Sequence, residues 1–126
     1  MTRLKICGLT NLEDARLALR AGADMLGFIF YEPSPRYIPP AQARDIVLAL
    51  REEVQRVRFV GVFVNASPDV VRQTLEYCGL DMAQLHGDES PEEVARFDGR
   101  AFKALNPRSA DETELLAQRF AAPPAP

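Results

Sequence analysis

The feature that most constrains the fold of this chain is the alternation of short, dense apolar runs with longer segments of helical periodicity. The apolar runs cover residues 4–7, 25–30, 59–64, 82–85 and 101–105, and turn residues bound them. Several runs are apolar at consecutive positions, as expected for strands covered on both faces in a parallel sheet. The sequence therefore predicts an α/β chain of five parallel βα units.

Signals for helix starts and stops lie between these runs. A capping box, in which a hydroxyl and a carboxylate three residues later satisfy free backbone N–H groups, is expected after Thr10, Ser90 and Ser109. Proline follows Ser67 and Ser90, at the first helical position. In three turns a glycine stands where a left-handed residue would end the helix, and these are Gly22, Gly79 and Gly99.

The last part of the chain departs from this pattern. A helix is expected at about residues 111–120, and it runs into the sequence AAPPAP at 121–126. A proline-rich segment can continue neither a helix nor a central strand. We therefore expect one domain at residues 1–120, followed by a linker or truncated end at 121–126.

Composition and charge argue against several classes of protein. The formal net charge of −3 comes from acids and bases scattered along the chain, without a basic block that could follow a nucleic-acid backbone. No apolar stretch approaches the roughly 20 residues that span a bilayer, and the N-terminus lacks the apolar region of a secretory signal. We expect a cytoplasmic protein that binds neither nucleic acid nor membrane.

The chain has two cysteines, Cys7 and Cys78, which are too few for a disulfide framework and match no zinc-site spacing. Cys7 ends the first apolar run, whereas Cys78 ends a helix at the opposite edge of the expected sheet. A disulfide would need their Cα atoms within about 7 Å, which this placement excludes. On burial preference alone, each is more often a small packing residue than a reactive one.

Polar side chains gather just past the expected strands, at the edge where parallel α/β folds bind ligands. They are Cys7, Arg36, Asn65, His86, Asp88, Asn106 and Arg108. A lone histidine is about as often a hydrogen-bonded structural residue as a functional one. The two asparagines and Arg108 are left out of the predicted site, because polar residues are common in such loops.

Four motifs then point to a family. KICGLT at residues 5–10, GFIF at 27–30 followed by SPRYIP at 34–39, VGVFVN at 60–65 and QLHG at 84–87 stand in this order at consecutive strand ends. Together they resemble phosphoribosylanthranilate isomerase over nearly the whole chain. The ordered set is far more specific than any one motif.

The resemblance implies units of a TIM barrel and an enzyme of tryptophan biosynthesis that uses no cofactor and no metal. Its reaction is an Amadori rearrangement, in which N-(5′-phosphoribosyl)anthranilate becomes its 1-deoxyribulose isomer. By resemblance Cys7 is the base that removes the C2′ proton, and Arg36 binds the anthranilate carboxylate. His86 and Asp88 lie near the substrate in supporting roles, and Asp14 belongs to the scaffold.

The resemblance also implies that part of the site lies beyond these motifs. The family places its general acid on a sixth strand and its phosphate-binding glycines after the seventh and eighth, whereas this sequence accounts for about five of the eight strands. We therefore expect an incomplete barrel, little turnover by the isolated chain and possible self-association through open sheet edges. Two alternatives stay open: a non-catalytic half-barrel for binding or assembly, and a barrel enzyme for another phosphorylated sugar amine.

Overall fold

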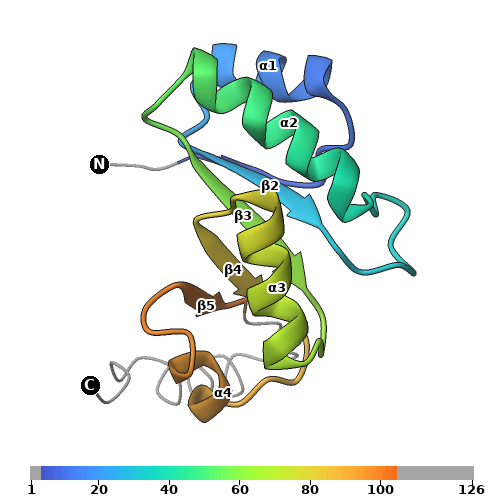
Figure 1. Cartoon of the computed structure of the whole chain (residues 1–126), viewed down its shortest axis with the longest axis vertical. Helices are drawn as coiled ribbons and strands as arrows, with labels where there is room; N and C mark the ends of the chain where they lie inside the picture. The colour runs from blue at the N-terminus through green and yellow to red at the C-terminus, as the bar shows by residue number, and fades with distance from the viewer. Residues whose placement is uncertain (1–3, 105–126) are drawn as a thin grey trace, which may run out of the picture.

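A computed structural model describes residues 4–104, and these form one parallel sheet with helices packed against it (Figure 1). The sheet has five strands in the order β1-β2-β3-β4-β5, and every neighbouring pair is parallel. The strands are β1 Lys5–Ile6, β2 Met25–Ile29, β3 Arg58–Phe63, β4 Met82–Leu85 and β5 Ala101–Lys103. Each predicted apolar run thus overlaps a strand, and the predicted and observed ends agree within two residues.

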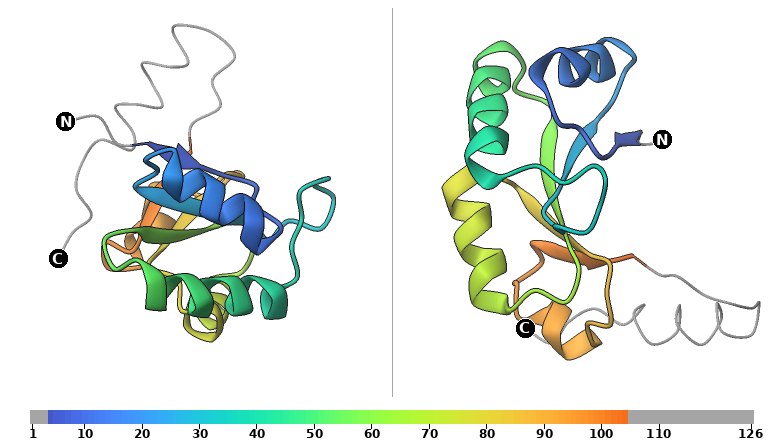
Figure 2. Two further views of the ribbon diagram at one scale, coloured as in Figure 1. Left: turned by 90° about the horizontal axis from the view of Figure 1, so that it is seen from above. Right: turned by 90° about the vertical axis from the view of Figure 1, so that its right-hand side faces the viewer.

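The helices are α1 Leu12–Arg20, α2 Pro40–Glu53, α3 Pro68–Cys78 and α4 Pro91–Ala95. Two further views of the ribbon show α1, α2 and α3 side by side on one face of the sheet (Figure 2). Strands that follow one another both in sequence and in space place successive helices on the same face. A doubly wound sheet instead reverses its strand order and carries helices on both faces. The order is that of consecutive units of a (β/α) barrel, and the sheet is not closed.

The predicted helix signals are confirmed at several positions and wrong at one. Ser67 and Ser90 cap α3 and α4, and each side chain accepts a hydrogen bond from the backbone N–H three residues later. The α1 cap is Asn11, one residue after the predicted Thr10, and its side chain accepts from the Asp14 N–H. An amide oxygen can cap a helix as well as a hydroxyl can. The three turn glycines all have a positive φ, as predicted.

The main hydrophobic core lies between the sheet and the helices. Phe28, Phe59 and Phe63 are its largest strand side chains and are almost fully buried. The Phe63 ring stacks on that of Phe30 at 5.5 Å between centroids, so these two rings fill the core together. Cys78 is also buried in this core, and its thiol donates to the Pro40 carbonyl at 3.3 Å.

A second buried layer lies on the other face of the sheet. Val60 and Val62 are buried but do not belong to the core between sheet and helices. They alternate along β3 with Phe59 and Phe63, which do belong to it, so the two valines point away from the helices. In a barrel this second face is the interior, and we call it the inner face.

An aspartate bridge joins strands at the amino edge of the sheet in two places. Asp24 and Leu4 bond reciprocally: the Asp24 N–H donates to the Leu4 carbonyl, and the Leu4 N–H donates to an Asp24 carboxylate oxygen at 3.1 Å. Asp81 and Phe59 repeat the arrangement, with 2.7 Å from the Phe59 N–H to the Asp81 carboxylate. Each aspartate also lies within ion-pair distance of an arginine. Each bridge therefore fixes the register at the start of a strand pair.

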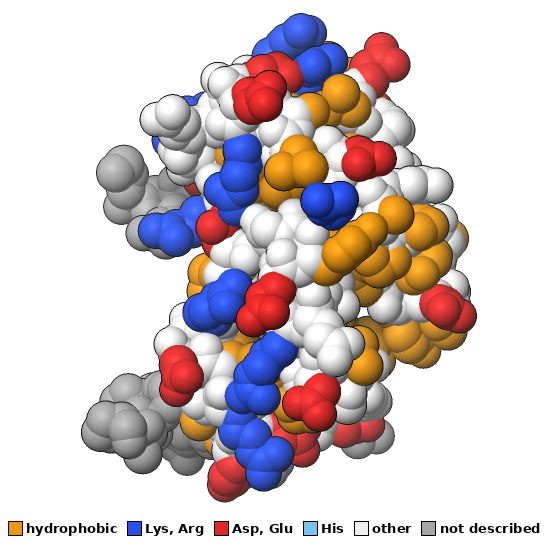
Figure 3. All heavy atoms as spheres, in the orientation of Figure 1, with side chains coloured by type: hydrophobic (Ala, Val, Ile, Leu, Met, Phe, Trp, Pro, Cys, Tyr) orange, Lys and Arg blue, Asp and Glu red, His pale blue; other side chains and the backbone are white. Residues whose placement is uncertain are grey.

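None of the helices in residues 4–104 is both long enough and apolar enough to cross a membrane. On the face seen in Figure 3, basic and acidic side chains are interspersed, and apolar side chains gather at the right of the view. The expected helix at about 111–120, the segment 121–126, Asn106 and Arg108 all lie outside the described residues.

Candidate active site

Cys7 lies on the inner face of the sheet, at the carboxyl edge of β1. Two residues earlier, the Lys5 side chain crosses this face, donates to the Gln84 side chain and lies 5.6 Å from the centre of the Phe102 ring. Side chains two positions apart along an extended chain share a face. Cys7 therefore continues the Lys5 row, one step nearer the rim, and it is half-buried with a free thiol.

The backbone of β2 makes room for the Cys7 side chain. A Cβ atom on Gly27 would lie 2.8 Å from the Cys7 sulfur and 3.2 Å from the Cys7 Cα. The Gly27 carbonyl accepts hydrogen bonds from the N–H groups of Gly8 and Leu9, at 3.1 and 3.2 Å. The glycine thus fixes the turn after β1 while leaving space for the thiol.

Gly8 brings Arg36 close to Cys7. Gly8 has a φ of +82°, a conformation that L residues rarely adopt, and a Cβ there would lie 2.6 Å from Cδ of Arg36. The Arg36 side chain therefore lies directly over the peptide that follows Cys7. Its own backbone N–H donates to the Ser34 hydroxyl at 3.1 Å, within a loop that also contains several prolines.

Cys7 and Arg36 line one hollow of about 590 Å³ beside β1. The hollow runs along the open edge of β1 beside α1, with Thr10 and Asp14 near the carboxyl end of β1 and Leu17, Ala18 and Ala21 further along α1. The Asp14 carboxylate accepts from the Asn11 side chain at 2.9 Å, so it takes part in the α1 cap. A thiol and a guanidinium at the rim of one hollow can act on a ligand that carries both an acidic proton and a carboxylate.

His86 and Asp88 lie on the loop after β4, at the same carboxyl edge but outside the hollow that Cys7 lines. Both are exposed. The His86 N–H donates to the Phe63 carbonyl at 2.8 Å, and the Asp88 N–H donates to the Asn65 side-chain oxygen at 2.7 Å. Within the described residues, the predicted site therefore divides into a Cys7–Arg36 pair and a separate loop.

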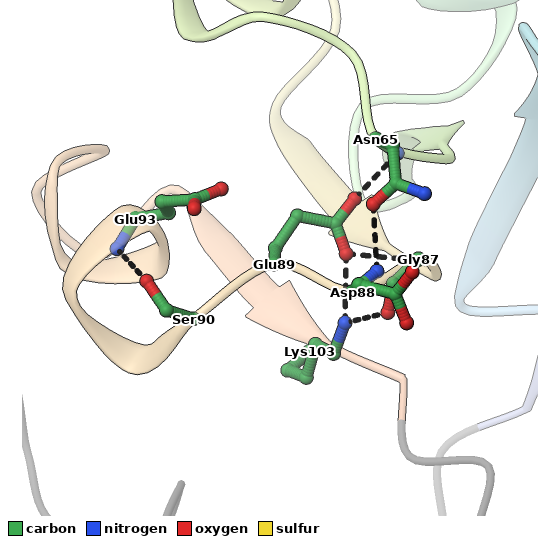
Figure 4. Close-up of polar contacts among 7 residues, drawn as sticks. All are labelled: Asn65, Gly87, Asp88, Glu89, Ser90, Glu93 and Lys103. Carbon is green, nitrogen blue, oxygen red and sulfur yellow. Dashed lines mark hydrogen bonds and ion pairs between the residues drawn. The ribbon is translucent and has the colours of Figure 1, made fainter.

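This loop is held by a polar group that we call the Glu89 cluster: Asn65, Gly87, Asp88, Glu89 and Lys103 (Figure 4). The Glu89 carboxylate accepts from the N–H groups of Asn65 and Gly87, each at 2.8 Å, and from the Lys103 ammonium at 2.7 Å. Lys103 also donates to the Gly87 carbonyl. The cluster joins the carboxyl ends of β3, β4 and β5.

The Glu89–Lys103 ion pair is buried, with side chains 3% and 8% exposed. Burial by itself would raise the pKa of the Glu89 carboxyl, but hydrogen bonds from Lys103 and from backbone N–H groups outweigh it and lower that pKa. The carboxylate is therefore ionised near neutral pH, and the lysine neutralises it.

Glu89 and Lys103 were not predicted as site residues. Lys103 lies inside an apolar run, AFKAL at 101–105, and a lysine in such a run signals a buried charge partner. Glu89 follows the QLHG motif in a polar stretch that resembles an ordinary solvated loop. Among the described residues, the structure contains no group of three or more side chains placed to hold a metal ion.

A sequence model of the family N-(5′-phosphoribosyl)anthranilate (PRA) isomerase matches residues 4–122. The isomerase of Citrifermentans bemidjiense is 50% identical over 117 residues, which are 93% of this chain and 55% of the relative. The isomerase of Syntrophus aciditrophicus is 46% identical over 117 residues, 92% of this chain and 50% of the relative. The chain thus spans about half the length of the curated relatives it matches.

Solved structures of the same kind share the fold. The phosphoribosylanthranilate isomerase of Thermotoga maritima superimposes with a TM-score of 0.86 at 40% identity, over 94% of this chain and 57% of that one. A structure of the isomerase in complex with reduced 1-(o-carboxyphenylamino)-1-deoxyribulose 5-phosphate has the same TM-score and identity and covers 60% of its chain. The likeness extends over the described sheet and its helices.

Proposed function

The chain belongs to the N-(5′-phosphoribosyl)anthranilate isomerase family, and from that premise we propose that it supplies five βα units and the base of an isomerase of tryptophan biosynthesis. The proposed reaction converts phosphoribosylanthranilate to its 1-deoxyribulose isomer. The observation that carries the proposal is the pairing of Cys7 with Arg36 at the carboxyl edge, where both line the same hollow beside β1.

In the proposed mechanism, the Cys7 thiolate removes the proton from C2′ of the ring-opened substrate and becomes a thiol. The electron pair of the broken C–H bond forms the C1′=C2′ double bond of the enolamine, while the protonated imine nitrogen takes up the pair of the C=N bond. Proton transfer to C1′ and loss of the C2′ hydroxyl proton then give the ketose product. A base must lie within hydrogen-bond reach of the proton it takes. The position of Cys7 on the inner face supports this role, because its thiol is only half-buried and lines the hollow from which substrate could reach the sulfur.

The Arg36 guanidinium is the proposed partner of the anthranilate carboxylate. A planar guanidinium can form two parallel hydrogen bonds with a carboxylate, which a lysine cannot. The loop from Pro33 to Arg36 contains two prolines, and the Arg36 N–H donates to the Ser34 hydroxyl, so the arginine loses less conformational freedom on binding. Its place across Gly8 puts that carboxylate next to the reacting carbons.

His86 and Asp88 are proposed to contact the sugar part of the substrate from the loop after β4. Both are exposed at the carboxyl edge, and the Glu89 cluster fixes the backbone between them. By resemblance the general acid belongs to a sixth strand, so no residue described here is assigned that task. We expect the 126-residue chain assayed by itself to turn over little substrate.

The test joins this chain to the remaining strands of the Thermotoga maritima relative and measures substrate consumption. Cys7→Ala should reduce kcat by a factor of about 100 or more, the scale of a lost general base. Cys78→Ala is the matched control, because that thiol is buried in the core below the helices. An unchanged rate in Cys7→Ala would remove this residue from the mechanism.

Anthranilate binding tests the Arg36 role separately. Arg36→Lys should weaken anthranilate binding about tenfold, since one of two parallel hydrogen bonds to a charged group is lost. Arg58→Lys, an exposed arginine at the amino edge, is the control. Equal affinity of both variants and the parent would instead favour a different sugar-amine substrate.

A further inference from the structure

Three consecutive backbone N–H groups of the loop after β4 have partners in the protein, and two of these partners belong to the Glu89 cluster. The His86 N–H donates to the Phe63 carbonyl, the Gly87 N–H to Glu89, and the Asp88 N–H to the Asn65 side chain. Free loops do not usually satisfy every amide inside the protein, because water serves them as well. The loop that carries two proposed substrate contacts is therefore held by specific protein groups.

Asn65 adopts an unusual backbone conformation that fits this arrangement. Its φ is +52°, in the left-handed region that non-glycine residues seldom occupy. Its N–H donates to the Glu89 carboxylate at 2.8 Å while its side chain accepts from Asp88. A Cβ on Gly87 would lie 2.4 Å from the Asn65 side-chain oxygen, so the two loops touch. Such local strain persists only where surrounding contacts hold it.

We propose that Glu89 is a positioning residue, whose carboxylate sets the backbone of the loop that presents His86 and Asp88 to the substrate. The inference rests on the proposed function for its substrate consequence, although the hold on the loop follows from contacts alone. One oxygen accepts from Gly87 and Lys103, and the other accepts from Asn65. A single side chain thus ties together the loops that follow β3 and β4.

Lys103 has a different part in this arrangement. Its ammonium is the charge partner of the buried carboxylate, and it also donates to the Gly87 carbonyl. Removing the lysine leaves both backbone bonds to Glu89 possible, whereas removing the carboxylate charge weakens them directly. Variants at the two positions therefore separate charge pairing from backbone positioning.

The experiment measures amide hydrogen exchange and binding of reduced 1-(o-carboxyphenylamino)-1-deoxyribulose 5-phosphate. In Glu89→Gln we expect the Asn65 and Gly87 amides to exchange at least about tenfold faster, since a charge-assisted hydrogen bond is replaced by a weaker one. The amide of Leu26 in β2 reports global stability and should keep its rate. Binding of the analogue should weaken about tenfold.

Glu93→Gln is the matched control, because Glu93 takes part in its helix cap through its backbone N–H. Lys103→Met should change the exchange of the two loop amides less than Glu89→Gln does. Equal acceleration of loop amides and of Leu26 would overturn the proposal, because Glu89 would then act only on global stability. Faster loop exchange with unchanged affinity for the analogue would overturn the substrate consequence.

The test also separates this inference from the proposed function. If the parent protein, joined to the remaining strands as above, does not bind the analogue, the proposed function fails. The exchange rates of the two loop amides then still decide whether Glu89 holds the loop.

Discussion

The two aspartate bridges allow one substitution to be compared at two sites of different burial. Asp81→Ala and Asp24→Ala remove the same side chain from the same type of turn. In each case the lost carboxylate accepts a backbone N–H from the neighbouring strand and faces an arginine. Any difference between their free energies of unfolding therefore reflects the surroundings of the hydrogen bond that each variant loses.

We expect Asp81→Ala to lower the free energy of unfolding by about 1–4 kcal/mol. Phe59 is fully buried, so water cannot replace the carboxylate as the partner of its N–H, and the unsatisfied N–H costs about 1–3 kcal/mol. The ion pair with Arg51 is partly exposed and adds up to about 1 kcal/mol. For Asp24→Ala we expect less than about 1 kcal/mol, because Leu4 is exposed and water can replace the carboxylate.

The assay is urea-induced unfolding of the full chain, followed by far-ultraviolet circular dichroism. For each variant, the slope of the free energy of unfolding against urea concentration is compared with that of the parent. An unchanged slope shows that the midpoint reports stability. Asp81→Asn should recover part of the loss, since an amide oxygen can still accept from Phe59. Equal losses for the two alanine variants would refute the argument that burial of the N–H sets the cost.

Three further predictions concern the thiols, the buried carboxylate and the inner face. Burial raises the pKa of the Cys78 thiol to about 11, so a thiol reagent near neutral pH should label Cys7 first, and Cys7→Ser should abolish the fast phase. Labelling of Cys7 and Cys78 at the same rate would contradict this prediction. The Glu89 pKa is lowered on folding, so its stabilising contribution is present above the unfolded carboxyl pKa and is lost as pH falls through the folded one. In Glu89→Gln, the free energy of unfolding measured with urea should therefore fall less steeply below about pH 4.5 than in the parent. The same pH dependence in both proteins would contradict this prediction. Gly27→Val should lower the free energy of unfolding by about 1–3 kcal/mol, because the valine side chain would occupy the space of the Cys7 sulfur. The same crowding should slow the labelling of Cys7. An unchanged labelling rate would show that the thiol has another path to solvent.

The sequence predicted the three central strands β2, β3 and β4 well because most of their residues are buried on both faces. Apolar residues at consecutive positions, as in RFVGVF of β3, are typical of such strands and differ clearly from the spaced pattern of the helices. The helix caps were harder, since Thr10 and Asn11 are adjacent and both can cap. Which of them does so depends on backbone geometry that residue type alone does not determine.

The candidate site was predicted in part, and the missing part has a physical reason. Cys7 and Arg36 belong to local motifs, so their proximity was expected from the family resemblance. The Glu89–Lys103 pair joins residues on different units, and each taken alone looks like an ordinary loop or strand residue. Only the register between β4 and β5 brings them together.

The two aspartate bridges divide the described sheet into successive two-strand modules. Each bridge spans one pair, β1 with β2 and β3 with β4, and each lies in the turn that leads into the second strand of its pair. A crossover point between the modules, near Val57, would leave both bridges intact. The two modules meet along β2 and β3, which pair at five positions, so a chimera joined near Val57 would keep both bridges and depend on the β2–β3 contact to align its halves.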